Sequence, residues 1–291
     1  MTRKIKLLVI DFAGTLSLET LLFGQDENLA AELECSGLAA LGVSPGIFWK
    51  ELVLPGWEEG SLTARGYTAV LAEHLCVFAQ NRGTPAPEAV IHAAASSFAE
   101  SYFTHSPVEN AWKETLTRLA AAPGAITLIA TDHYAEATAH IRGLLSAWNI
   151  SSRPLLSAAE TAVRPTPFII ANSADLGAHK AAAAFWKTVK ASLEKSFCRG
   201  GCFQEIFSAI YIVDDFGFNE NAADAYGGQE KALRRREKTA ARVKDVLGPE
   251  PEVFSFFLEG RARAAGGKIL RETYNAMVCR ASEFLAPCSA S

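Results

Sequence analysis

The chain has 291 residues, of which 49% are hydrophobic and 21% are charged. This length and apolar content suffice for one large domain, or for a core with an added subdomain. The formal net charge of −4 gives no electrostatic basis for a nucleic-acid partner, so binding to DNA or RNA is not expected.

The cysteine spacing indicates neither a disulfide framework nor a zinc site. Of the six cysteines, Cys198 and Cys202 are four residues apart, but no second pair or histidine cluster accompanies them. Free thiols are typical of a reducing compartment, and we expect a cytoplasmic protein. The first apolar run is cut at Asp11 after four residues, too short for a signal peptide or a membrane span. No membrane partner is therefore expected.

The first predicted element is a buried strand at Leu7–Ile10, a short run of aliphatic residues. Asp11 follows it directly, and Gly14 and Thr15 predict a tight turn. The carboxyl ends of strands are where an open α/β sheet presents reactive groups. Asp11 is therefore a candidate nucleophile or metal ligand.

A block of helices is predicted between the first and second strands. Ser44 and Pro45 form an N-cap followed by Pro at the first helical position, and Ser61 and Thr63 give similar start signals. The block is too large for a simple crossover, so it predicts a helical subdomain inserted above the sheet. A helix at about Val108–Ala121 would return the chain to the core. The four amphipathic stretches are Glu27–Leu41, Pro45–Leu54, Thr63–Gln80 and Glu88–Phe103.

The rest of the chain alternates strands with helices. This alternation predicts an α/β fold with a Rossmann-like, doubly wound parallel sheet. The predicted strands are Ile126–Ala130, Phe168–Ala171, Ile210–Val213 and Val253–Phe257, and helices between them include Glu136–Trp148 and Lys180–Glu194.

Two helices are predicted near the end of the chain. Gln229–Val246 is highly charged, and its basic stripe suits either a phosphate-bearing partner or, as we prefer, a solvated helix with pairs such as Glu230–Arg234. Lys268–Leu285 should form a closing helix. The predicted domains are a catalytic core at 1–17 and 107–258, a helical cap at 18–106 and a helical extension at 259–291.

Polar clusters also end the later strands. Thr131 and Asp132 follow the second strand, where they can hold an anion at a helix N-terminus or simply cap the helix. Asp214 and Asp215 follow the fourth strand, and adjacent carboxylates need a cation or hydrogen-bond donors to be tolerated. Mg²⁺ is the natural occupant, and capping of the next helix by Asp215 is compatible with it. Lys180, after the third strand, would neutralise these carboxylates.

The order Asp, Thr, Lys, Asp-Asp, each just past a successive strand, resembles the haloacid dehalogenase-like hydrolase superfamily. The resemblance extends from Leu7 to Phe257 and includes a helical cap after the first motif, with Gly60–Thr63 similar to a common start of a cap helix. The four motifs are matched by Asp11-Phe12-Ala13-Gly14-Thr15, Thr131-Asp132, Lys180 and Asp214-Asp215.

The resemblance implies a hydrolase in which Asp11 attacks phosphorus and forms an aspartyl-phosphate that water hydrolyses. Thr131 and Lys180 would hold the phosphoryl oxygens, and Asp132 would also lie at the substrate. The implied ligands of Mg²⁺ are Asp11, the Ala13 carbonyl, Asp214 and Asp215.

The cation of the third motif has two candidates. Arg164, in an Arg-Pro-Thr-Pro run, follows Thr131 by fewer residues than Lys180 does. We prefer Lys180 because it follows the third strand and should open a helix, which assigns Arg164 to an inserted loop.

Ala13 is the main departure from the superfamily pattern. Typical phosphatases of this superfamily carry Asp at that position, which protonates the leaving oxygen and later activates water. A positioned acid or base contributes typically ~10²–10⁴-fold. An ordinary alkyl phosphate should therefore be a poor substrate, unless the cap or the substrate itself supplies an acid.

The first motif is similar to that of phosphonoacetaldehyde hydrolase, in which a cap lysine forms a Schiff base with the substrate. Lys50 is the candidate for that role, with a surface position on its helix as the alternative.

We expect a Mg²⁺-dependent hydrolase of a small phosphorylated or phosphonylated metabolite. One alternative is hydrolysis of a carbon–phosphorus or carbon–halogen bond by the same Asp11. Another is a non-catalytic binding or assembly protein with a degenerate site. The sequence names neither the substrate nor the oligomeric state.

Overall fold

The computed structural model describes residues 4–83, 86–157, 168–198, 202–220, 227–258 and 267–289. Its centre is a six-stranded, all-parallel sheet in the order β3-β4-β2-β1-β5-β6. All five predicted strands are present. Of the described strands, the sequence missed only the short edge strand β3, whose three residues Ser-Arg-Pro carry no aliphatic run. The strands are β1 Ile5–Ile10, β2 Ala125–Thr131, β3 Ser152–Pro154, β4 Phe168–Asn172, β5 Phe207–Asp214 and β6 Pro251–Ser255.

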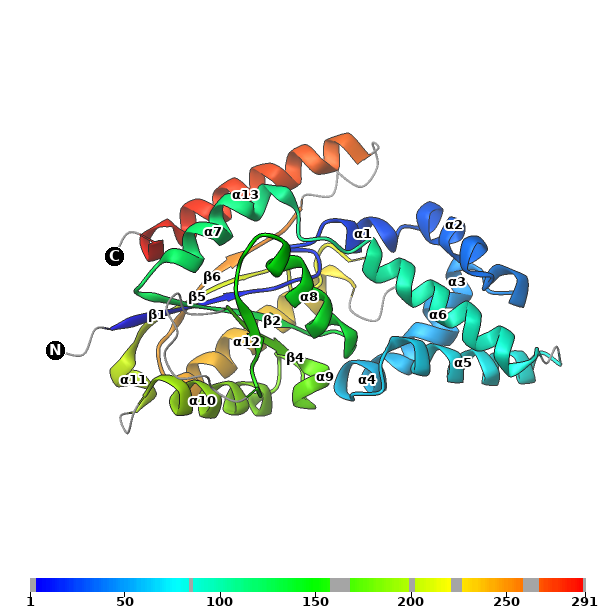
Figure 1. Ribbon diagram of the computed structural model, residues 1–291, viewed down its shortest axis with the longest axis horizontal. Helices are drawn as coiled ribbons and strands as arrows, with labels where there is room; N and C mark the ends of the chain where they lie inside the picture. Colours follow the sequence, from blue (N-terminus) through cyan, green and yellow to red (C-terminus); the bar gives the residue numbers. More distant parts are fainter. Residues whose placement is uncertain are drawn as a thin grey trace.

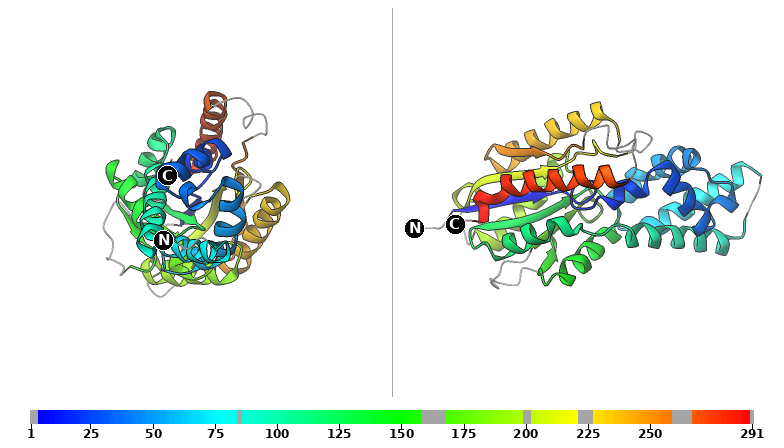
Figure 2. Two further views of the ribbon diagram at one scale, coloured as in Figure 1. Left: turned by 90° about the vertical axis from the view of Figure 1, so that its right-hand side faces the viewer. Right: turned by 90° about the horizontal axis from the view of Figure 1, so that it is seen from above.

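Helices cover both faces of the sheet, as Figures 1 and 2 show. Side chains of a strand point alternately to opposite faces, and β1 follows this rule. Leu8 and Ile10 pack in one core with α7 (Lys113–Ala121), α8 (Glu136–Ala147) and α13 (Gly267–Ser289). Leu7 and Val9 pack in a second core with α10 (Ala183–Phe197) and α12 (Gln229–Leu247). The predicted doubly wound α/β class is confirmed.

A helical layer lies beyond the carboxyl ends of the strands (Figure 1). This cap has its own hydrophobic core, in which Leu33, Leu75 and Phe98 are almost fully buried. The layer is therefore a separately packed unit inserted between β1 and β2. Its helices are α1 Glu19–Phe23, α2 Asp26–Ser36, α3 Pro45–Ile47, a π-helical turn Phe48–Val53, α4 Leu54–Leu62, α5 Tyr67–Asn81 and α6 Glu88–Thr104.

The predicted helix starts at Ser61 and Thr63 are wrong. Ser61 lies near the end of α4, Thr63 is the C-cap of that helix, and α5 begins only at Tyr67. Sequence reasoning missed α4 because Pro55 and Gly56 read as breaks in the helical pattern. In the structure they occupy its first turn, where proline loses no needed hydrogen bond.

The part of the chain that the structure describes contains neither a disulfide nor a helix that could span a membrane. All six cysteines are unpaired, with Cys198 buried and Cys202 exposed. Among the described helices, none combines the length and apolar content that crossing a bilayer requires.

The cap is seated on the core through polar and close-packed contacts of α4 and α5. The Ser173 hydroxyl donates to the Ser61 carbonyl (2.6 Å), and the Tyr67 amide donates to the Glu136 carboxylate (2.8 Å). Gly60 faces the ring of Tyr134 so closely that a Cβ atom would collide with it. The absence of a side chain at Gly60 thus allows α4 to approach the end of β2.

We predict that Gly60→Ala destabilises the protein by about 1–3 kcal/mol, because overpacking a tight contact costs that much. Gly46→Ala is the matched control: it adds the same methyl to a cap helix at a position with no atom within 4 Å, and should be neutral or stabilising. Denaturant unfolding of both variants measures the difference. Equal stability of the two variants would contradict the tight seating of α4 on Tyr134.

Candidate active site

The predicted site residues converge at the point where the strand order reverses. The chain builds β2 and β4 on one side of β1, then crosses to build β5 and β6 on the other. Such a switch point is where open α/β sheets form their sites. Asp11 follows β1, and Asp214 ends β5. Together with Asp215 they present carboxylate oxygens within 4.8 Å of one another, all buried.

Lys180 joins this cluster. Its Nζ donates to Asp11 Oδ1 (2.6 Å) and to Asp214 Oδ2 (2.7 Å). Its backbone amide donates to Asp132 Oδ1 (2.9 Å), and its carbonyl accepts from Trp186 Nε1 (2.7 Å). These bonds fix both the lysine and its loop at the two carboxylates.

The predicted position of Lys180 at a helix start is wrong. It lies on the loop between α9 (Ser173–Leu176) and α10, three residues before α10 begins. The backbone amide and carbonyl of Lys180 form hydrogen bonds with the side chains of Asp132 and Trp186 instead of hydrogen bonds within a helix. The rival cation Arg164 lies outside the described residues.

Asp215 is held by backbone amides of its own turn. Asp215 Oδ1 accepts from Gly217 N (2.8 Å) and Oδ2 from Asn219 N (3.2 Å), while its own amide donates to Thr15 Oγ1 (3.1 Å). Gly14 has φ +73°, and a Cβ atom there would lie 2.5 Å from Asp215 Oδ2. The glycine of the first motif therefore makes room for the carboxylate of the fourth.

The turn after β5 is fixed from two further directions. Phe216 has φ +55°, a left-handed conformation that is uncommon outside glycine. Its amide donates to Asp214 Oδ1 (2.6 Å), and its carbonyl accepts from Arg235 Nε of α12 (2.9 Å). The charged helix thus contributes one arginine to the site, while Glu230 and Arg234 form the predicted surface pair.

The electrostatics show more buried carboxyl groups than the lysine can neutralise. Burial raises the pKa of Asp11 well above its usual value, partly offset by Lys180. Burial and then the charge of Asp214 raise the pKa of Asp215 to about 7. Burial alone would lower the pKa of Lys180, but the carboxylates of Asp11 and Asp214 outweigh it and raise the pKa. The lysine is therefore charged, and it neutralises only one of three carboxylates.

The residues present fit a divalent cation. Three buried carboxylates against one ammonium leave an uncompensated charge that a hard, oxygen-preferring ion such as Mg²⁺ would balance. Asp11, Asp214 and Asp215 would hold it, and Ala13, the fourth predicted ligand, lines the same cavity.

Thr131 and Asp132 have different roles in the structure. Thr131 Oγ1 is buried and has no hydrogen-bond partner among the described residues, although it lines the cavity beside Asp11. A buried hydroxyl of this kind costs free energy unless a ligand completes it. Asp132 also lines the cavity, but its carboxylate accepts from the Lys180 amide, so it orients the loop.

The structure does not bring Lys50 to the site. Lys50 is exposed on the π-helical turn, while its neighbours Phe48 and Trp49 are buried and line the cavity. Successive residues of a helix point in different directions, and the apolar pair takes the inner face. The exposed position of Lys50 therefore contradicts the predicted contact between this lysine and the substrate.

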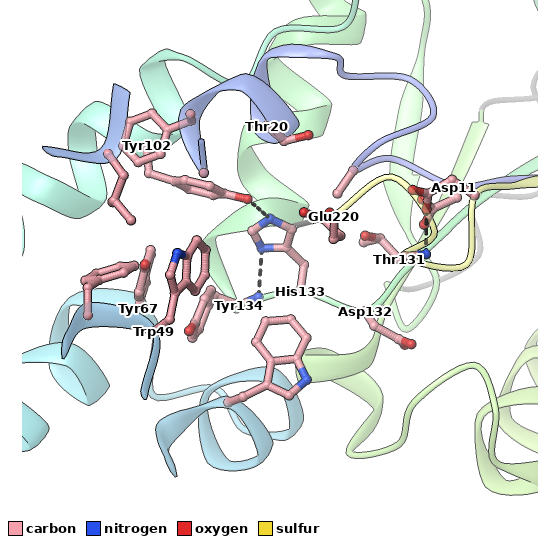
Figure 3. Close-up of a pocket in the computed structure, with 18 of the residues that line it drawn as sticks. Asp11, Thr20, Trp49, Tyr67, Tyr102, Thr131, Asp132, His133, Tyr134 and Glu220 are labelled. Atoms are coloured by element: carbon pink, nitrogen blue, oxygen red, sulfur yellow. Dashed lines mark hydrogen bonds between the residues drawn. The ribbon is translucent and has the colours of Figure 1, made fainter. Parts of the chain in front are cut away.

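Sequence reasoning missed the cap-side residues of the cavity. Figure 3 shows Trp49, Tyr67, Tyr102 and Tyr134 gathered around His133, away from Asp11, with Glu220 between the two ends. These residues lie in ordinary helical or loop patterns, so only a known cap position could have singled them out.

Comparison with known proteins gives similarity to solved structures alone. No family model and no curated protein matches the chain. It is similar to a 2-haloacid dehalogenase from Pseudomonas syringae pv. Tomato DC3000, at 14% identity over 91% of this chain and 90% of that chain, with a TM-score of 0.46.

Two other solved structures are similar to a comparable degree. One is a HAD family enzyme from Bacteroides thetaiotaomicron in complex with magnesium and inorganic phosphate (14% identity, 91% and 98% covered, TM-score 0.43). The other is an L-2-haloacid dehalogenase from Xanthobacter autotrophicus with chloropropionic acid covalently bound (13%, 86% and 94%, 0.39). Likeness of this degree assigns no activity, so the function is argued from the site.

The raised carboxyl pKa values predict a pH-dependent effect of Mg²⁺ on stability. Asp215 titrates at about 7 in the folded protein against 3.8 in the reference state, so the native state binds more protons between these values. Metal-free stability should therefore fall as the pH rises through this window, while Lys180 stays charged. Mg²⁺ favours the ionised carboxylates, so it should raise the unfolding temperature more at about pH 8 than at about pH 5.

Thermal unfolding with Mg²⁺ or with a chelator measures this difference. Asp215→Asn, which keeps the shape and removes the charge, should lose most of it. A Mg²⁺ shift of the same size at both pH values would contradict the metal assignment.

Proposed function

We propose that the chain is a Mg²⁺-dependent hydrolase of the haloacid dehalogenase-like superfamily, acting on a small phosphorylated or phosphonylated molecule. The proposal rests on one observation above all: the buried oxygens of Asp11, Asp214 and Asp215 lie within 4.8 Å of one another, with Lys180 between two of them. Unpaired thiols support a cytoplasmic location in this proposal.

Asp11 is the nucleophile in this proposal. One carboxylate oxygen attacks phosphorus, the bond from phosphorus to the leaving group breaks, and the leaving group departs with the electron pair. Water then attacks the phosphorus of the aspartyl-phosphate, which releases phosphate and restores Asp11. Asp214 is less suited to the nucleophile's role because both its oxygens already accept hydrogen bonds, one from Lys180 Nζ and the other from Phe216 N.

Lys180 and Thr131 supply the groups that stabilise the transferred phosphoryl. The Lys180 ammonium is preorganised at Asp11 and buried from water, where its charge has its greatest effect. The unpartnered Thr131 hydroxyl can donate to a phosphoryl oxygen. Bound Mg²⁺ would contribute charge neutralisation at the phosphoryl oxygens.

The alternative reactions have less support. A Schiff-base route to carbon–phosphorus cleavage needs a neutral amine at the substrate, but Lys50 is exposed and Lys180 is held as an ammonium. Dehalogenation would use Asp11 without a metal, which leaves the Asp214–Asp215 pair without a purpose. A non-catalytic role predicts that loss of Asp11 has no effect.

Asp11→Asn should abolish phosphate release, by at least ~10³-fold, because an amide is not a nucleophile toward phosphorus. Phosphate and aldehyde release over a panel of phosphate esters and phosphonates, with and without Mg²⁺, is the measurement. Asp245→Asn, the same change at an exposed position, should keep full activity. Unchanged turnover in a folded Asp11→Asn variant would rule out Asp11 as the nucleophile, and a folded wild type without turnover on any substrate would favour the non-catalytic role.

Lys180→Met should destabilise the metal-free protein by about 3–5 kcal/mol, because it leaves buried carboxylates without their counter-charge. Mg²⁺ should recover part of this stability but not the activity, since the phosphoryl group still lacks its ammonium. Denaturant unfolding and turnover are compared with Lys187→Met, an exposed lysine of α10. Stability equal to that of the control would contradict the buried ion-pair account.

A further inference from the structure

Ala13 restricts the leaving groups that the site can expel. The residue lines the cavity beside Asp11, and its methyl group cannot donate a proton. An alkoxide is a poor leaving group without such a donor, whereas a phenol has a pKa of about 10 and departs far more readily as its anion. The missing acid therefore favours a substrate whose leaving oxygen belongs to a phenol.

The other end of the cavity is lined by aromatic rings. Eight of the described lining residues are Phe, Trp or Tyr, contributed mostly by the cap. Tyr67 of the cap and Tyr134 of the core stack face to face, with centroids 4.0 Å apart and planes 7° apart. Trp49 lies in the same group (Figure 3). Flat rings at this end suit a flat, apolar leaving group.

His133 adds a polar but uncharged group to this end. Its Nδ1 accepts from the Tyr134 amide (2.8 Å), and burial lowers its pKa to about 3, so the ring is neutral. The ring proton must then lie on Nε2, which donates to the Tyr102 oxygen (2.9 Å). No positive charge arises here at neutral pH.

The charge of the cavity excludes anionic substituents on the leaving group. Lys180 is the only Lys or Arg among the described lining residues, and it is paired with Asp11 and Asp214. Glu220 lies between the two ends of the cavity as a further acid. A carboxylate on the leaving group would meet repulsion, and no unpaired Lys or Arg among the described lining residues would offset it.

Trp49 supplies an orphan hydrogen-bond donor. The residue is 8% exposed, and Nε1 has no partner among the described residues, although the side chain lines the cavity. The far edge of the ring packs over Gly24, where an added Cβ would lie 3.3 Å from it. A buried N–H without an acceptor costs free energy that a ligand acceptor would recover.

We propose that the substrate is the phosphate ester of a small, uncharged phenol that carries a hydrogen-bond acceptor for Trp49. This inference rests on the proposed function. Asp11 forms its bond to phosphorus as the bond from phosphorus to the aryl oxygen breaks. The phenolate leaves with the electron pair and takes its proton from water afterwards.

Three phosphate esters separate the effect of an acidic leaving group from the effect of its ring. Phenyl phosphate has both the ring and the acidic leaving oxygen. Benzyl phosphate keeps the ring with an alcohol oxygen, and a fluorinated alkyl phosphate keeps the acidity without a ring. In the wild type, kcat/KM for phenyl phosphate should exceed kcat/KM for benzyl phosphate by ~10²-fold or more. It should exceed kcat/KM for the fluorinated alkyl phosphate by about tenfold.

A series of substituted phenyl phosphates tests the missing acid directly. The wild-type rate should depend steeply on the acidity of the phenol, and Ala13→Asp should flatten this dependence and raise benzyl phosphate turnover at least about tenfold. A shallow dependence in the wild type that becomes steep in Glu220→Gln would assign the acid to Glu220 and overturn the proposal.

Trp49→Phe tests the orphan donor, because it keeps a ring and removes the N–H. In the wild type, some uncharged phenyl phosphates carry an acceptor at the ring position that faces Trp49. They should be hydrolysed about tenfold faster than the acidity of their phenol predicts from the other esters. The variant should lose this excess rate. An equal loss for all esters would overturn this part of the proposal.

Failure of this inference is distinguishable from failure of the proposed function. If phenyl and benzyl phosphate are hydrolysed equally well and Asp11→Asn abolishes both, the substrate class is wrong and the hydrolase stands. If phosphate release from every ester survives Asp11→Asn, the proposed function itself fails.

Discussion

The structure depends on burying three carboxylates around a single ammonium. Asp11, Asp214 and Asp215 are each at most 5% exposed, and Lys180 is 4% exposed. Charges this deep are tolerated only with good partners. The backbone amides of Phe216, Gly217 and Asn219 supply part of that compensation. The negative charge that remains uncompensated is suited to a divalent cation, and the same uncompensated charge makes the site reactive.

A second set of contacts holds the nucleophile turn from behind. The Thr15 carbonyl accepts from Tyr274 Oη (2.6 Å) and from Trp112 Nε1 (3.0 Å), both almost fully buried. Tyr274 belongs to α13, near the end of the chain, and Trp112 immediately precedes α7. The closing helix therefore does more than cover one face of the sheet: it fixes the backbone that carries Asp11 and the Thr15 hydroxyl.

The cavity divides its work between core and cap. The core end holds the charges that act on the phosphoryl group, and the cap end holds rings that select what is attached to it. Ala13 makes the core end dependent on the cap end. Because the site has no acid of its own at this position, it must rely on a leaving group that the cap selects. The neutral His133–Tyr102 pair keeps the selecting end free of positive charge.

Sequence alone determined the sheet and the positions of its reactive residues. Every described strand except β3 contains a local run of apolar residues, and Asp11, Thr131 and Asp214 mark where three of these runs end. Parallel strands bring their carboxyl ends to one edge, so local pattern was sufficient to predict that these residues meet.

Tertiary structure decided what the cap presents to them. Lys50 and Trp49 are neighbours in sequence, yet packing turned the indole inward and left the amine outside. The same packing set Lys180 on a loop, made Asp132 its anchor and placed Gly60 against Tyr134. These outcomes depend on contacts between segments far apart in the chain, and helical periodicity carries no information about which face such contacts will cover.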